Sequence, residues 1–157
     1  MDDWTRLHVQ ARLRRGGYTD ATLVAESGVA DATLVAESGV ADATLMAFEA
    51  KRDARTALIG FGFERLDDGE LMSSGTVGLP YPEASAQPGA GAADPWLVVG
   101  GWEDLDPDRW VVVGKLRDSQ ATRCTAVTTV SSIPLPVSSG VVVGWVESAH
   151  EVVYDVR

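Results

Sequence analysis

An eleven-residue unit is repeated in the first third of this chain, and it constrains the fold more than any other feature. The unit DATLVAESGVA occupies residues 20–30 and recurs unchanged at residues 31–41. A divergent third copy, DATLMAFEAKR, follows at residues 42–52. Eleven residues make three helical turns at about 3.67 residues per turn, so an apolar stripe would stay aligned from one copy to the next. The period therefore predicts a long helix over residues 20–57.

Helical placement of the repeat predicts two apolar lines, one of small residues and one of leucines. The third copy contains Glu49, Ala50 and Lys51, which favour a helix. A lone helix cannot bury both lines, so we expect a homo-oligomer, with a trimer as the working number. The predicted oligomer interface comprises Ala21, Val24, Ala25, Gly28, Val29, Ala32, Val35, Ala36, Gly39 and Val40 on the small-residue face, with Leu23, Leu34 and Leu45 in the leucine row.

Other interpretations of the repeat stay open at this point. The Ser-Gly pairs at residues 27–28 and 38–39 are typical of turns and would divide the segment into short helices. An eleven-residue coil of a β-solenoid would also repeat in this way, although solenoids usually contain more copies.

A third alternative comes from residues 33–52, TLVAESGVADATLMAFEAKR, which resemble a helix-turn-helix DNA-binding unit. Gly39, Val40, Leu45 and Phe48 fall where that family places its turn glycine and core residues. The resemblance implies a transcriptional regulator with a β sensing domain. The sequence departs from the family at Val35, which is larger than the usual residue, and its second helix has no basic or amide side chain before Lys51.

The residues before the repeat predict a short helix at 2–15 that is ended by Gly16-Gly17. This helix is basic, although the whole chain has a formal net charge of −10. Its arginines are predicted to form an arm that docks onto an acidic partner or a neighbouring copy: Arg6, Arg12, Arg14 and Arg15. The alternative is that the last three only stabilise the C-terminal end of the helix dipole.

From residue 58 onward the pattern changes to short apolar runs separated by turn residues. These runs predict an antiparallel β-sandwich or barrel of about seven strands over residues 58–157. Residues 79–95 are rich in Pro, Gly and Ala and predict a loop. The expected fold class is therefore α+β, with a helical segment at 1–57 and an antiparallel β domain after it.

No catalytic motif is recognisable, and neither a cofactor nor a metal ion is expected. Cys124 is the single cysteine and is predicted to be a small buried residue. The acidic loop with Glu103, Asp104, Asp106 and Asp108 lacks the glycine and distal glutamate of a helix-loop-helix calcium site. Trp96, Trp102, Trp110 and Trp145 are expected in the core or an interface, with a sugar-binding row as the alternative.

These observations predict a non-enzymatic structural or assembly protein that associates with itself and makes contacts through a β head. The layout is similar to that of accessory proteins of virus particles, such as bacteriophage capsid-decoration or tail components, although no motif carries this similarity. The acidic charge argues against nucleic acid as a partner. The N-terminus lacks the apolar region of a signal peptide and no run is long enough to span a membrane, so synthesis in the cytoplasm, with possible incorporation into a particle, is expected.

Overall fold

A computed structural model describes residues 3–28, 40–66, 68, 70–83, 94–103, 109–147 and 152–157. This part of the chain forms one helix and eleven strands in three antiparallel sheets, in the spatial orders β1-β2-β3-β4, β5-β6-β10-β9 and β11-β7-β8. The elements are α1 (Asp3–Arg15), β1 (Thr19–Gly28), β2 (Val40–Arg52), β3 (Arg55–Leu66), β4 (Leu71–Pro80), β5 (Trp96–Glu103), β6 (Arg109–Leu116), β7 (Cys124–Val127), β8 (Ser132–Leu135), β9 (Val137–Ser138), β10 (Val141–Glu147) and β11 (Val153–Val156).

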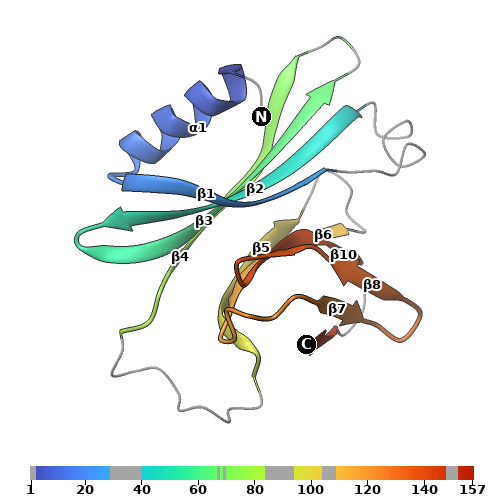
Figure 1. Ribbon diagram of the computed structural model, residues 1–157. Coiled ribbons are helices and arrows are strands. Elements are labelled where there is room, and N and C mark those ends of the chain that lie inside the picture. Colours follow the sequence, from blue (N-terminus) through green and yellow to red (C-terminus); the bar gives the residue numbers. More distant parts are fainter. Residues whose placement is uncertain are drawn as a thin grey trace.

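The helix and the three sheets are stacked as layers (Figure 1). We call the apolar contact between α1 and the first sheet the helix layer, and it contains Val9, Leu13, Met46, Phe48 and Phe61. The middle layer lies between the first and second sheets and contains Ala25, Leu45, Ala47, Leu58, Val111, Val113, Val141 and Val143. The outer layer lies between the second and third sheets and includes Trp96, Val112, Cys124, Ala126 and Val142.

The repeat forms strands, so the predicted long helix over residues 20–57 is wrong. The first copy supplies β1 and the third copy supplies β2, and the two strands pair antiparallel with Leu23 opposite Phe48 and Ala25 opposite Ala47. Residues 29–39, which include most of the second copy, lie outside the described residues. The predictions of a coiled coil and of an eleven-residue helical stripe are therefore wrong as well. The helix-turn-helix alternative is corrected on the same ground, because its described residues lie in β2.

The third copy shows why this segment is a strand. Met46, Phe48 and Ala50 alternate along β2 and are buried in the helix layer, whereas Leu45 and Ala47 are buried in the middle layer. A strand covered on both faces has apolar residues at successive positions, and such a run also satisfies a helical pattern. The apolar pattern of this copy therefore does not separate a helix from a strand.

The first and second sheets are both covered on both faces, and this explains their long apolar runs. In β3 the residues from Ala57 to Glu64 are all buried. In β6 and β10 the three successive valines of each strand are buried, at residues 111–113 and 141–143. A single sandwich or barrel of about seven strands is therefore also wrong, because a two-sheet sandwich encloses only one apolar layer. The expected boundary between residues 57 and 58 lies within β3.

The sequence predicts one hairpin from the runs IGFGFERL and ELMSSGTVGL, joined by an Asp-Gly turn, and a second from PWLVVGGW and RWVVVGKL. Both are confirmed in the described residues, where β3 pairs antiparallel with β4 and β5 pairs antiparallel with β6. The predicted loop at 79–95 begins within the end of β4, and its residues 84–93 lie outside the described part of the chain. No helix among the described residues is long and apolar enough to cross a membrane.

The short helix expected at residues 2–15 corresponds to α1, which ends at the predicted glycine pair. The amide of Tyr18 donates to the carbonyl of Leu13 at 2.9 Å, and the amide of Gly17 donates to the carbonyl of Arg14 at 3.0 Å. Gly17 has a φ of 75°, so these bonds form a Schellman motif with glycine in the left-handed position. The motif directs Tyr18 back against the helix layer, where it packs on the core.

The β2–β3 hairpin turns through only two residues, Asp53 and Ala54, since Arg52 is directly opposite Arg55. Their φ angles are 52° and 62°, as a type I′ turn requires. Asp tolerates this region better than most residues, but Ala54 carries a Cβ in a conformation that favours glycine.

We expect Ala54→Gly to raise the free energy of unfolding by about 0.5–1 kcal/mol, because glycine removes the left-handed strain and keeps the turn. Urea unfolding measures the change. Ala57→Gly is the matched control: Ala57 is a buried strand residue, so its replacement should be destabilising. Destabilisation by both substitutions would contradict the strain at the turn.

Candidate functional site

Two neighbouring pockets share Tyr18 at the end of the molecule where α1 meets the β2–β3 hairpin. The first has a volume of about 240 Å³ and is lined by Tyr18, Arg52, Asp53, Arg55, Ala57, Gly78 and Pro80. The second has a volume of about 290 Å³ and is lined by Gln10, Leu13, Arg14, Tyr18, Thr19, Asp20 and Ala21. We call the first one the Tyr18 pocket. Its walls come from the α1–β1 connection, the hairpin and β4, so it depends on the correct pairing of the first sheet.

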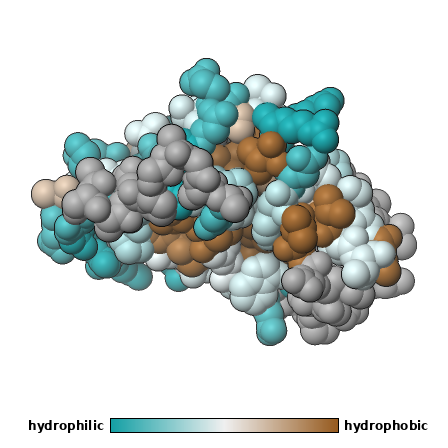
Figure 2. Space-filling model, turned by 90° about the horizontal axis from the view of Figure 1, so that it is seen from below, coloured by the Kyte–Doolittle hydropathy of each residue, from teal (hydrophilic) through white to brown (hydrophobic). Residues whose placement is uncertain are grey.

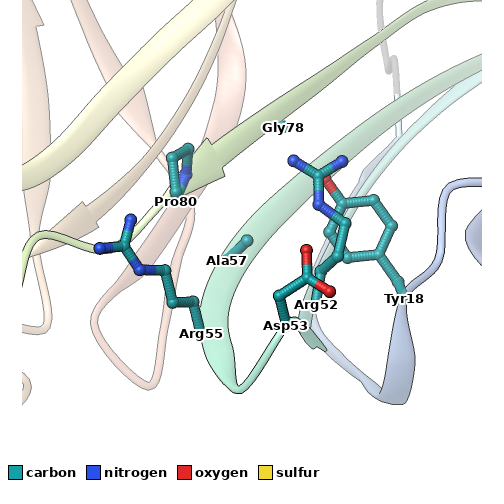
Figure 3. Close-up of a pocket in the computed structure, with 7 residues that line it drawn as sticks. All are labelled: Tyr18, Arg52, Asp53, Arg55, Ala57, Gly78 and Pro80. Atoms are coloured by element: carbon teal, nitrogen blue, oxygen red, sulfur yellow. The ribbon is translucent and has the colours of Figure 1, made fainter.

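Arg52 lies against the ring of Tyr18 in the Tyr18 pocket. Its guanidinium carbon is 5.0 Å from the ring centroid, which is a cation–π distance. Figure 3 shows the guanidinium beside the Tyr18 ring, while Arg55 extends away from them on the far side of Asp53. This contact restricts the flexible arginine side chain. Within the described residues, no carboxylate pairs with Arg52.

The charges around the pockets are mixed, with a small basic excess. Arg14, Arg52 and Arg55 line the two pockets together with Asp20 and Asp53. Arg55 is already engaged, because its guanidinium forms an ion pair with Glu83 in which both side chains are exposed. Arg52 is therefore the arginine of the Tyr18 pocket that is best placed to take a new partner.

A stacked guanidinium of this kind suits an oxyanion. Arginine presents a planar fork of donors that matches the two oxygens of a carboxylate or phosphate. The hydroxyl of Tyr18 lies near Gly78, where a Cβ on that glycine would be 3.1 Å from the oxygen. A side chain at residue 78 would therefore crowd the pocket floor.

The predicted docking arm is only partly placed at this site. Arg6, Arg12, Arg14 and Arg15 are all exposed on α1, and Arg14 lines the second of the two pockets. Arg12 donates a hydrogen bond of 3.0 Å to the hydroxyl of Ser73 on β4. Sequence reasoning missed Arg52 and Arg55 because it placed them on a helix. The signal was the run KRDAR, in which basic residues flank a two-residue turn.

The described residues of the predicted oligomer interface are scattered over different parts of the first sheet, because they shared one face only on a helix. Ala21 and Leu23 are exposed on β1, and Val24 is half-buried. Ala25 and Leu45 are buried in the chain's own middle layer. Gly28 ends β1 and Val40 begins β2. The remaining members lie outside the described residues: Val29, Ala32, Leu34, Val35, Ala36 and Gly39.

A second polar cluster joins the first two sheets and has a structural role. The hydroxyl of Tyr81 donates to Oε1 of Glu49 at 2.6 Å, and Nζ of Lys115 lies 3.4 Å from the same oxygen. Lys115 also donates to the carbonyl oxygen of Ser139 at 2.8 Å. Burial, followed by the hydrogen bond and the charge of Glu49, raises the pKa of Tyr81. The phenol therefore stays protonated at neutral pH and is unsuited to act as a base.

The four tryptophans of the second sheet do not form one exposed row. Trp102 and Trp145 pack against the middle layer, Trp96 is buried in the outer layer, and Trp110 is partly exposed. Trp102 occupies a slot left by glycines, since a Cβ on Gly75 would lie 2.2 Å from its Nε1 and a Cβ on Gly62 would lie 3.1 Å from its ring. This arrangement is one of core packing and offers no aromatic platform for a sugar.

The face seen from below carries separate hydrophobic patches divided by hydrophilic surface (Figure 2). Among the exposed apolar side chains of the third sheet and its loops are Val127, Val130 and Val153. Val127 and Val153 are directly opposite each other on β7 and β11. Small scattered patches are normal for a protein surface and do not identify a binding face.

The metal-ligand candidates and the single cysteine were examined among the described residues. No group of three or more His, Cys, Asp or Glu residues there could hold a metal ion. The acidic loop considered for calcium is described only at Glu103, since residues 104–108 lie outside the described part. Cys124 is buried, and burial together with the charge of Asp155 raises its pKa to about 11.

We expect Gly75→Ala to lower the free energy of unfolding by about 1–3 kcal/mol, because the new methyl would overlap the Trp102 ring. Gly78→Ala in the same strand is the comparison, and we expect it to cost less, since its methyl would come within 3.1 Å of the Tyr18 hydroxyl, the far end of a side chain that can shift, and no closer than 3.7 Å to Ile59. In urea unfolding, the double variant Gly75→Ala, Trp102→Leu should lose less unfolding free energy than the sum of the losses of the two single variants. Losses that simply add would contradict the overlap between residue 75 and the Trp102 ring.

We expect the thiol of Cys124 to react with a disulfide reagent at pH 8 about 100-fold more slowly in the native chain than in urea, because it is covered and protonated. The folded chain holds this proton more tightly than the unfolded chain. The thiol proton therefore adds to the free energy of unfolding, and this contribution is fully present below the unfolded pKa of 9.0 and is lost as pH rises toward about 11. A Cys124→Ala variant should lack this part of the pH dependence. Rapid labelling of the native chain would contradict the burial.

Comparison with known proteins finds no match: no protein-family model, no curated protein and no solved structure is similar to this chain. Its function is therefore inferred from its own geometry.

Proposed function

We propose that this chain is a non-enzymatic assembly protein that binds a carboxylate group of a protein partner in the Tyr18 pocket. The observation that carries the proposal is the Arg52 guanidinium stacked on Tyr18 at 5.0 Å, with no carboxylate partner among the described residues. Hydrogen bonds between charged groups contribute about 1.5–3 kcal/mol, which is enough for one arginine to influence association.

The partner that we infer is a second copy of the chain. The chain carries 23 acidic against 13 basic residues, so carboxylates outnumber basic side chains on a second copy. A basic site on an acidic protein favours a head-to-tail contact, because the site of one copy meets a different surface of the next. This contact uses the Tyr18 pocket and differs in this way from the interface expected from the sequence, which required the helical repeat. The number of copies is a matter for measurement.

We expect the purified chain to associate at low ionic strength, and we expect Arg52→Gln to weaken this association at least about tenfold, because a charged hydrogen bond is lost. Sedimentation velocity at about 20 mM and 300 mM salt measures the effect, since salt should screen the exposed contact. Arg123→Gln is the matched control: Arg123 is exposed before β7 and undergoes the same loss of charge.

Two results would count against the proposal. A chain that stays monomeric at about 100 µM in low salt would exclude a second copy as the partner. Equal weakening by Arg52→Gln and Arg123→Gln would show that net charge drives association and that the Tyr18 pocket does not.

A further inference from the structure

We propose that the carboxylate bound in the Tyr18 pocket belongs to the turn between β3 and β4 of a second copy, so that copies join end to end in an open chain. This inference rests on the proposed function and names the surface that meets the pocket. Asp68 and Glu70 are the described residues of this turn, and both are exposed. We call these two residues the acidic turn.

The acidic turn and the Tyr18 pocket lie at opposite ends of the first sheet (Figure 1). β3 connects them, since it begins at Arg55, which lines the pocket, and ends at Leu66, beside the turn. A strand of 12 residues is about 40 Å long at roughly 3.3 Å per residue. Glu70 therefore cannot reach Arg52 of its own chain, and a contact between these two side chains must join two copies.

Backbone hydrogen bonds hold the acidic turn in shape and leave the carboxylate of Glu70 for a partner. The amide of Glu70 donates to Oδ1 of Asp68 at 2.9 Å, and its carbonyl oxygen accepts from the amide of Leu66 at 2.8 Å. Among the described residues, the Glu70 carboxylate makes no hydrogen bond or ion pair. A turn that is already ordered loses little conformational entropy when it binds.

The other exposed carboxylates of the described residues outside the two pockets are less suited to this contact. Four of them have partners in their own chain, either an arginine or a backbone amide: Glu83, Asp94, Asp118 and Asp155. Glu26 and Glu103 are strand residues of β1 and β5. A hairpin turn projects from the end of a sheet and can enter a concave pocket, so Glu70 is the carboxylate that we choose.

The opposite placement of pocket and turn determines how association continues. When the turn of one copy occupies the pocket of the next, the first copy keeps an empty pocket and the second keeps an unused turn. A contact between two different surfaces extends into a chain unless its rotation closes a ring. Because the two surfaces are separated by the length of β3, we expect an open chain that lengthens as the protein concentration rises.

Exchange of the two charges tests the contact. At about 20 mM salt, Arg52→Glu and Glu70→Arg should each weaken self-association at least about tenfold, because each places like charges together. The double variant Arg52→Glu, Glu70→Arg has the net charge of the unmodified chain and should associate at least about tenfold more tightly than Arg52→Glu alone. Sedimentation velocity measures these changes.

The matched control for the charge exchange is Arg52→Glu combined with Glu26→Arg. It has the same net charge as the double variant, and Glu26 is likewise an exposed carboxylate of the first sheet. This control should associate no more tightly than Arg52→Glu alone, because the acidic turn is unchanged and faces a glutamate at position 52.

A mixture of neutral variants tests the end-to-end arrangement. Arg52→Gln retains the acidic turn, and Glu70→Gln retains the pocket and the backbone bonds of the turn. Each variant alone should associate at least about tenfold more weakly than the unmodified chain. An equal mixture should form a dimer with one copy of each variant and grow no further, whereas the unmodified chain should form trimers and larger species.

Failure of this inference can be told from failure of the proposed function. If Arg52→Gln weakens association but Glu70→Gln does so no more than Glu26→Gln, the pocket binds another carboxylate and the acidic turn is wrong. No tightening in the charge-exchanged chain, or no dimer in the mixture, overturns it as well. An unmodified chain that stops at a dimer overturns the open chain. A monomeric unmodified chain overturns both proposals.

Discussion

The burial of the β2–β3 hairpin on both faces is the constraint on which the rest of this structure depends. Met46, Phe48 and Phe61 require a cover on one side, and Leu45, Ala47 and Leu58 require one on the other. The helix α1 supplies the first cover, through Val9 and Leu13, and the second sheet supplies the other. Since buried apolar area is the main stabilising contribution in a small domain, neither cover can be removed without exposing a core layer.

The Tyr18 pocket is a consequence of this stacking. The Schellman motif that ends α1 turns Tyr18 toward the first sheet, and the two-residue turn after β2 brings Arg52 to the same end. A protein with α1 and the hairpin placed differently would have the same arginines without the stacked pair. The proposed binding of a carboxylate therefore rests on tertiary geometry at a site where two local motifs meet.

The edge strand β1 has a different relation to the core. It contributes Val24 and Ala25 to the middle layer, whereas β2 and β3 contribute to two layers each. An edge strand with few buried side chains contributes little to the core, so local opening of a sheet starts most easily there.

Several local features of the fold could be predicted from the sequence. The glycine pair after Arg15 predicts the end of α1, and the alternation in IGFGFERL predicts a strand that pairs with the run after the Asp-Gly turn. These predictions succeed because a capping motif or a hairpin turn is decided by residues that are close in sequence. The burial of Cys124 was likewise predicted from the strand-like run RCTAVTTV in which it lies.

The repeat and the candidate site could not be predicted in this way. Successive apolar residues such as those from Leu45 to Phe48 fit a helix and a doubly covered strand equally, because local periodicity does not tell whether a second cover exists. The sequence by itself determined where the helix ends, where the β3–β4 and β5–β6 hairpins form and which residues are apolar. The tertiary structure alone decided that the repeat is a strand and that Tyr18 meets Arg52, since each of these depends on surfaces contributed by distant parts of the chain.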